Sequence, residues 1–199
     1  MKTFVILTAL VSLGTANAQP LSKQDRDKAV KYLQQTRDGV STSVKGLSDG
    51  QMKWKSAPDR WSVAETLEHI AKAEDLLMQN ITANVMKAPA APAEGRDNAK
   101  IDAFVMAVIP DRSRKAQAPE ALVPGGTWTP AETLDHFLKS RANTISFAES
   151  AEGLRDHAID SPLGQKLDGY QWILFIAAHS ERHTKQILEV KADAGFPKQ

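Results

Sequence analysis

The sequence predicts an all-α protein, built as a four-helix bundle with a long irregular connection between its second and third helices. Four stretches repeat apolar residues at steps of three and four, which is the spacing of an amphipathic helix. The period-two alternation that is typical of strands is almost absent. Four amphipathic helices of this length bury their apolar faces against one another as a four-helix bundle.

The first 18 residues form a segment apart from this domain. Lys2 gives a positively charged start, residues 4–13 are apolar, and residues 16–18 (Ala-Asn-Ala) have the pattern of a cleavage site. This arrangement predicts a signal peptide over 1–18 and a mature domain over 19–199, exported to the periplasm or secreted. The alternative is an N-terminal helix that stays attached. No stretch is long enough for a permanent anchor, so we expect no stable membrane insertion.

The first bundle helix is expected over residues 22–47, and a polar loop over residues 53–60 follows it. One face of this helix collects apolar side chains: Val30, Leu33, Val40, Val44 and Leu47. Residues 48–50 (Ser-Asp-Gly) end the helix, because these residue types favour turns over helix interiors.

The second and third helices begin with the same chemistry. Ser62 is followed three residues later by Glu65, and Thr129 is followed three residues later by Glu132. Each pair predicts a capping box, in which the two side chains satisfy free amide groups of the first turn. The two predicted helices run over residues 62–87 and 129–151.

Residues 93–127, between the second and third helices, are the least regular part of the chain. Residues 101–109 predict a short helix that Pro110 stops, and the prolines and glycines that follow predict a loop. A connection this long in a bundle often covers or shapes a functional site. After a second polar loop, residues 153–168, the fourth helix is expected over residues 169–193.

Charge and cysteine content exclude several classes of function. The chain has 25 basic and 24 acidic residues, and Lys2 is the only charged residue of the first 18, so the mature domain is neutral. This balance suggests no nucleic acid and no membrane surface as a partner. The chain has no cysteine, so it can be neither a lipoprotein nor a thiol enzyme, and any metal must use histidine and carboxylate ligands.

The strongest chemical signal is the pair His179 and His183 in the fourth helix. Residues four apart lie one turn apart on a helix, and this pair falls in the middle of the apolar stripe that includes Trp172. Buried imidazoles need partners for their ring nitrogens, and one metal ion would satisfy both. The alternative is two core histidines with ordinary hydrogen bonds. The metalloprotease pattern H-E-x-x-H is excluded because Ser180 follows the first histidine, and Glu181 falls on the solvent side.

His69 is the natural third ligand, although a lone histidine at the edge of an apolar stripe is more often structural. Three histidines are a common ligand set for a divalent metal ion, here Zn, Ni or Mn. Three protein ligands also leave a coordination position for water or substrate.

His136 is not expected to be a ligand, although residues 128–136 closely resemble residues 61–69. It falls on a polar face of the third helix, and His157 lies in a loop. The shared helix-start chemistry explains most of this likeness, although an ancient duplication would also explain it.

The sequence does not decide whether three charged residues contribute to the site. Glu65 could orient His69 as a second-shell carboxylate, but its role in the capping box is the simpler interpretation. Glu74 and Arg141 fall within apolar stripes. They either pair, line a pocket, or lie near an exposed end of the bundle.

These motifs resemble a known family. The first motif is the segment from Arg60 to Ile70, which reads Arg-Trp-Ser-Val-Ala-Glu and then His-Ile. The second motif lies far downstream and reads His179-x-x-Arg-His183-x-x-Gln-Ile. Together they resemble the DinB-like (DinB/YfiT-type) superfamily of metal-binding four-helix bundles. The resemblance implies a metal held by His69, His179 and His183. It also implies a thiol-dependent transferase or isomerase, or a metal-dependent hydrolase, and commonly a homodimer. The expected export departs from the pattern of this family. It argues against a thiol-dependent transferase, because small-thiol cofactors are chiefly cytosolic.

Three functions remain open from the sequence. The first is a metal-dependent transferase or hydrolase that acts on a small-molecule substrate. The second is a non-catalytic bundle that binds a metal and a ligand, which the lack of an obvious general base favours. The third is a structural metal that joins the second helix to the fourth.

Overall fold

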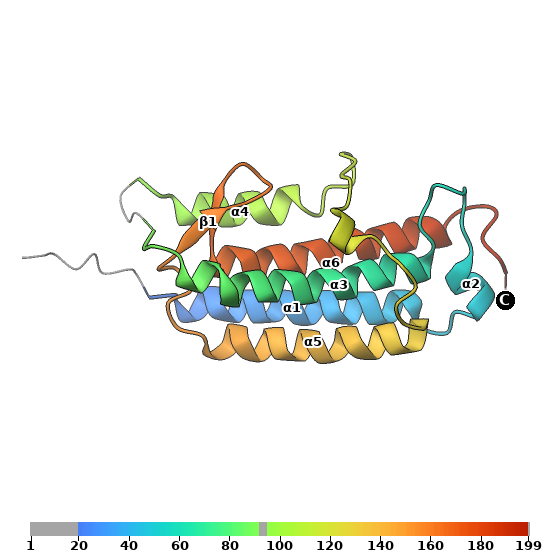
Figure 1. Ribbon diagram of the computed structural model, residues 1–199, viewed down its shortest axis with the longest axis horizontal. Coiled ribbons are helices and arrows are strands. Elements are labelled where there is room, and N and C mark those ends of the chain that lie inside the picture. The colour runs from blue at the N-terminus through green and yellow to red at the C-terminus, as the bar shows by residue number, and fades with distance from the viewer. Residues whose placement is uncertain (1–19, 92–94, 199) are drawn as a thin grey trace, which may run out of the picture.

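The computed structural model describes residues 20–91 and 95–198 and confirms the all-α bundle (Figure 1). The four bundle helices are α1 (Lys23–Val44), α3 (Val63–Ala83), α5 (Pro130–Ser150) and α6 (Gly169–Lys191). α1 and α3 each pack against both α5 and α6, so the order around the bundle is α1, α6, α3, α5. The last helix in the sequence therefore lies between the first two.

Capping boxes begin three of the four bundle helices. The two predicted boxes, at Ser62 and Thr129, are both present. A third box at the start of α6, formed by Asp168 and Gln171, was not predicted. These caps satisfy backbone amides that the first turn of each helix leaves without partners.

The bundle core consists of two apolar clusters separated by a polar layer. Leu33 and Ile81 belong to one cluster, and Val40 and Ile70 belong to the other. Between them lie buried polar residues from all four helices: Thr36, Glu74, Arg141, Thr144, Ser180 and His183.

Arg141 is the centre of this polar layer and is fully buried. Its guanidinium donates to both carboxylate oxygens of Glu74 at 2.8 and 2.7 Å, to the Leu33 carbonyl at 2.9 Å, to Thr36 Oγ1 at 2.8 Å and to Ser180 Oγ at 2.7 Å. All five N–H groups of the side chain are satisfied, which makes burial of the charge tolerable. The expectation that these two residues lie near an exposed end is wrong, and the expectation that they pair is confirmed.

Several short elements surround the bundle. α4 (Asn98–Val108) corresponds to the predicted short helix and packs on the outside of α6 (Figure 1). α2 (Asp49–Lys53), capped by Ser48, occupies a segment that we expected to be a helix end and a loop, because Ser-Asp-Gly here begins a helix. Two single turns, η1 (Val85–Lys87) and η2 (Glu120–Leu122), complete the helical elements.

One small sheet interrupts the helical pattern. β1 (Ala158–Asp160) pairs with β2 (Lys166–Asp168) in an antiparallel hairpin, in the segment that we expected to be loop. Each strand has three residues, which is too short for an alternating pattern to be visible in the sequence.

The expected signal peptide, residues 1–18, lies outside the described residues. Within the described part of the chain, no helix is both long and apolar enough to cross a membrane.

Candidate metal centre

Three histidine rings converge beside the polar layer. α3 supplies His69, and α6 supplies His179 and His183, one turn apart. Nε2 of His69 lies 3.2 Å from Nε2 of His179 and 3.2 Å from Nε2 of His183. One ring nitrogen from each histidine lies within 4.8 Å of the other two. The structure therefore brings together the three residues that the sequence singled out.

Neighbouring groups determine which ring nitrogens carry protons. Nδ1 of His69 lies 2.8 Å from the Leu122 carbonyl, which can only accept a hydrogen bond. Nδ1 of His183 lies 2.9 Å from Oε1 of Gln186, and that oxygen also accepts from Arg112 at 3.1 Å. Both Nδ1 atoms are therefore the donors, and both Nε2 atoms carry lone pairs that face each other.

This arrangement fits a divalent metal ion. Two lone pairs 3.2 Å apart repel each other unless a proton or a cation lies between them. Zn–N bonds of 2.0–2.1 Å at tetrahedral angles place ligand nitrogens about 3.3 Å apart. The observed spacing is close to this value, and the Nδ1–H groups of His69 and His183 already donate to oxygen, as in most histidine–metal sites.

The electrostatics keep all three rings neutral. Burial lowers the pKa of His69, and it lowers the pKa of His179 well below its usual value, with further lowering by the neighbouring His183. Burial, and then the nearby His69, lowers the pKa of His183 to about 3. Neutral imidazole is the form that binds a metal, so the site does not have to release protons at neutral pH.

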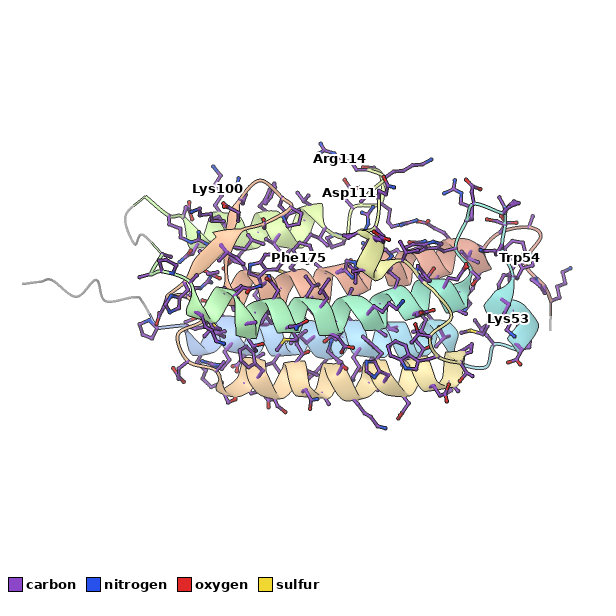
Figure 2. The ribbon with its side chains drawn as sticks, viewed as in Figure 1. Lys53, Trp54, Lys100, Asp111, Arg114 and Phe175 are labelled. Carbon is purple, nitrogen blue, oxygen red and sulfur yellow. The ribbon has the colours of Figure 1, made fainter. Side chains whose placement is uncertain are left out.

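The cluster is most accessible at His179. His69 and His183 are buried, whereas His179 is half-buried. The ring of Phe175 stacks toward His179 at 6.4 Å between centroids, and Figure 2 shows Phe175 on α6 between α3 and α4. On the other flank, the ring of Trp61 lies 4.9 Å from that of His69.

The other two histidines lie outside the cluster. Nε2 of His136 lies 2.6 Å from a carboxylate oxygen of Asp75, and its ring stacks on Trp128 at 4.5 Å. His157 lies beside Ala90 in an isolated bridge. Neither belongs to the group that could share a metal ion.

Among the described residues, no hydrogen bond or ion pair joins Glu65 to His69. Its carboxylate accepts from the Ser62 backbone at 2.8 Å and from Lys55 at 2.8 Å. The capping interpretation therefore describes its role in this structure.

Sequence reasoning missed the residues that hold the connection between α4 and α5 against the site. We call residues 109–127 the strap. The Arg182 guanidinium donates to the carbonyls of Ile109, Asp111 and Arg114 at the start of the strap. The Glu68 carboxylate accepts from three consecutive backbone amides, those of residues 125–127, at its end. The resemblance motif contained Arg182, but no sequence pattern pointed to Glu68.

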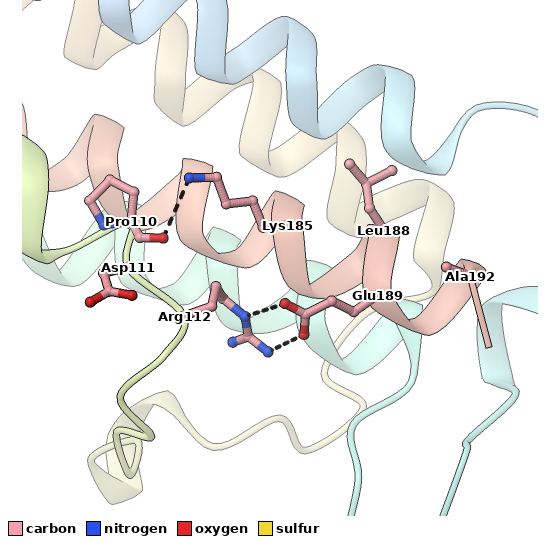
Figure 3. Close-up of a pocket in the computed structure, with 7 residues that line it drawn as sticks. All are labelled: Pro110, Asp111, Arg112, Lys185, Leu188, Glu189 and Ala192. Atoms are coloured by element: carbon pink, nitrogen blue, oxygen red, sulfur yellow. Dashed lines mark hydrogen bonds and ion pairs between the residues drawn. The ribbon is translucent and has the colours of Figure 1, made fainter.

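A surface pocket lies where the strap crosses the outer face of α6 (Figure 3). Arg112 forms two hydrogen bonds with the Glu189 carboxylate there, and Lys185 donates to the Pro110 carbonyl. None of the three clustered histidines lines this pocket. It is part of the attachment of the strap to α6 and is not the candidate metal centre.

Comparisons with known proteins identify a family and a relative for this chain. The family model described as the DinB superfamily matches residues 32–187. The uncharacterized protein YuaE of Bacillus subtilis (strain 168) is 28% identical over 150 residues, which cover 74% of this chain and 88% of that protein.

A solved structure shares the fold. YfiT from Bacillus subtilis, described as a probable metal-dependent hydrolase with an unusual four-helix bundle topology, aligns with a TM-score of 0.56 at 14% identity. The alignment covers 89% of this chain and 91% of that one. At this identity the likeness shows the fold alone, but the family match spans most of the sequence, and the chain therefore belongs to the DinB superfamily.

Proposed function

We propose that this protein is a metal-dependent hydrolase in which His69, His179 and His183 hold one divalent metal ion. The observation that carries the proposal is the convergence of three Nε2 atoms, two of them at 3.2 Å from the third, with the lone pairs of His69 and His183 directed at each other. The description of YfiT as a probable metal-dependent hydrolase supports the same class of reaction.

The protein groups have defined roles in this proposal. Leu122 and Gln186 orient the rings of His69 and His183. His179 is the most exposed of the three histidines, and we expect a small-molecule substrate to approach from its side. A Zn²⁺, Ni²⁺ or Mn²⁺ ion held by these histidines would supply Lewis acidity for the hydrolysis.

The carboxylates near the histidines in sequence already have partners. Glu68 binds the strap, Glu74 pairs with Arg141, and Glu181 accepts from Tyr32 at 2.6 Å and pairs with Lys185 at 2.7 Å. None of these is positioned as a general base. This observation assigns no general base among these carboxylates, and it keeps a non-catalytic metal- and ligand-binding bundle as the second candidate.

Metal analysis combined with a substrate screen tests the proposal. Elemental analysis is expected to find about one equivalent of Zn, Ni or Mn in the wild-type protein and none in the His179→Ala/His183→Ala variant. Metal-dependent hydrolysis of an ester or amide panel, absent from the variant, supports the hydrolase. Bound metal without turnover favours the binding bundle, and no metal in the reconstituted wild type overturns both.

We also propose that residues 1–18 are a signal peptide and that the protein is exported. The positive start, the short apolar run and the Ala-Asn-Ala sequence support this proposal. Expression of the full chain in a bacterial host, followed by mass spectrometry, is expected to find a mature N-terminus at Gln19 in the exported fraction. An intact N-terminus in the cytosol contradicts it.

A further inference from the structure

The residue directly before a clustered histidine holds each end of the strap. Glu68 precedes His69 and binds the end of the strap, and Arg182 precedes His183 and binds its start. Between these two attachments, the strap supplies the Leu122 carbonyl that accepts from His69 Nδ1 at 2.8 Å. The strap therefore contacts the site directly and is anchored on the same two helices that carry the histidines.

The attachment at Glu68 has a specific geometry. The amides of Gly125, Gly126 and Thr127 donate to its carboxylate at 3.1, 2.8 and 3.1 Å. Three successive amides that point at one anion form a nest, and Gly126 adopts the positive φ of 70° that helps to form it. Lys72 closes the arrangement, since Nζ lies 3.0 Å from the Glu68 carboxylate and 3.1 Å from the Val123 carbonyl.

We propose that Glu68 is a positioning residue for the metal centre. It anchors the nest of the strap, the anchored strap fixes the Leu122 carbonyl three residues before the nest, and that carbonyl holds His69 with Nε2 directed at the site. The proposal rests on the metal site proposed above. It assigns to Glu68 a role that differs from ligation and from proton transfer, since its carboxylate is occupied by the strap.

The third helix of the bundle provides a matched control. Asp135 in α5 precedes His136 as Glu68 precedes His69, and it pairs with Lys139 four residues on, as Glu68 pairs with Lys72. Among the described residues, Asp135 forms no hydrogen bond or ion pair with the strap. Glu68→Gln and Asp135→Asn therefore remove equivalent charges from equivalent helical positions, and only the first disturbs the strap.

The test is a Co²⁺ titration of the metal-free protein, followed by the visible absorption of the bound ion. Glu68→Gln is expected to weaken Co²⁺ binding about tenfold, the lower end of the range for residues that orient metal ligands. Asp135→Asn is expected to bind within twofold of the wild type. Gly126→Ala changes no residue of α3, but it strains the nest because position 126 has a positive φ. This variant is also expected to weaken Co²⁺ binding. It provides the test if Glu68→Gln does not fold.

A second readout separates positioning from a purely structural role. Because coupling is reciprocal, saturating Co²⁺ should slow tryptic cleavage of the strap at Arg114 and Lys115 in the wild type, and this protection should be smaller in Glu68→Gln. A folded Glu68→Gln or Gly126→Ala variant with unchanged Co²⁺ affinity and full protection overturns the proposal and leaves the metal site standing. A wild type that binds no Co²⁺ overturns the metal site itself, and with it this inference.

Discussion

The segments that begin α3 and α5 share six of nine residues, yet only the histidine of α3 belongs to the cluster. Residues 61–69 and 128–136 both contain a capping box, and both place a tryptophan ring against the histidine, at 4.9 and 4.5 Å. The two segments therefore share a helix start and a tryptophan–histidine contact, although the rings are tilted in the first segment and stacked in the second.

What packs on the flank of each helix differs. The strap and α6 cover the flank of α3, so His69 is only 3% exposed and meets two histidines and a backbone carbonyl. The side chain of His136 is 36% exposed and meets Asp75. The helix α1, which packs against α5, contains no histidine. The shared segment therefore determines where a helix starts, whereas the metal site depends on the elements that pack beside the helix.

The largest expected loss of stability concerns Glu74 in α3 and Arg141 in α5, which bind each other. Glu74 and Arg141 each lie 13 residues after the tryptophan of their segment. Replacing either one by Ala should lower the free energy of unfolding by about 3–5 kcal/mol, because the other charge stays buried without its partner. Urea unfolding measures this loss, and Lys139→Ala, in an exposed pair, should cost less than about 1 kcal/mol. A loss below about 1 kcal/mol for Arg141→Ala contradicts the account.

The second prediction compares His69→Ala with His136→Ala. A metal ion at 100 times its dissociation constant should raise the free energy of unfolding by about 2.7 kcal/mol in the wild type. His136→Ala should keep this stabilisation, and His69→Ala should lose most of it. Unfolding of each variant with Zn²⁺ and after chelation measures the difference, and equal stabilisation of the two variants would place the metal elsewhere.

The third prediction uses the pH dependence of Glu68. Burial alone raises the pKa of this carboxyl, but the amides of Gly125 and Thr127, Lys72 and the amide of Gly126 outweigh it and lower the pKa to about 2. A lowered pKa in the folded state stabilises the protein above the ordinary value near 4.5, and the stabilisation disappears as the pH falls toward 2.

The metal-free wild type should therefore lose roughly 2 kcal/mol more stability than Glu68→Gln over this range. Denaturation midpoints at several pH values measure the difference, and the buried histidines affect both proteins alike. Parallel pH profiles for the two proteins would show that the strap does not hold Glu68 as its contacts indicate.

The smallest expected loss of stability tests what the two segments share, which is the capping box. Ser62→Ala and Thr129→Ala each remove one capping box, and each should lower the free energy of unfolding by about 1 kcal/mol. Thermal unfolding of the two metal-free variants checks that the losses agree. A much larger loss for Ser62→Ala would mean that this segment has a role in the fold that its counterpart lacks.

Helix starts and helix faces were predictable from the sequence because they depend on local chemistry. Each capping box, at Ser62 and at Thr129, is visible within four residues of sequence. Helical spacing places His179 and His183 on the apolar face of α6, and it places His136 on a polar face of α5. The hairpin at β1 and β2 was not predictable, because its strands are too short to show a pattern.

The contacts that hold the site together were not predictable for a different reason. In the strap, Glu68 binds backbone amides 57 to 59 residues away, and Arg182 binds carbonyls 68 to 73 residues away. Backbone groups carry no side-chain signature, so neither interaction leaves a pattern in the sequence. The position of Glu74 and Arg141 at mid-bundle likewise depends on how the helices pack.

The central claim is that His69, His179 and His183 hold one divalent metal ion, and the anomalous diffraction of a metal-loaded crystal tests it most directly. Data collected at the absorption edge of the metal should give a single peak, which for Zn²⁺ lies about 2.0–2.1 Å from Nε2 of each of the three histidines. No peak at this cluster, or a peak between His136 and Asp75 instead, would contradict the account.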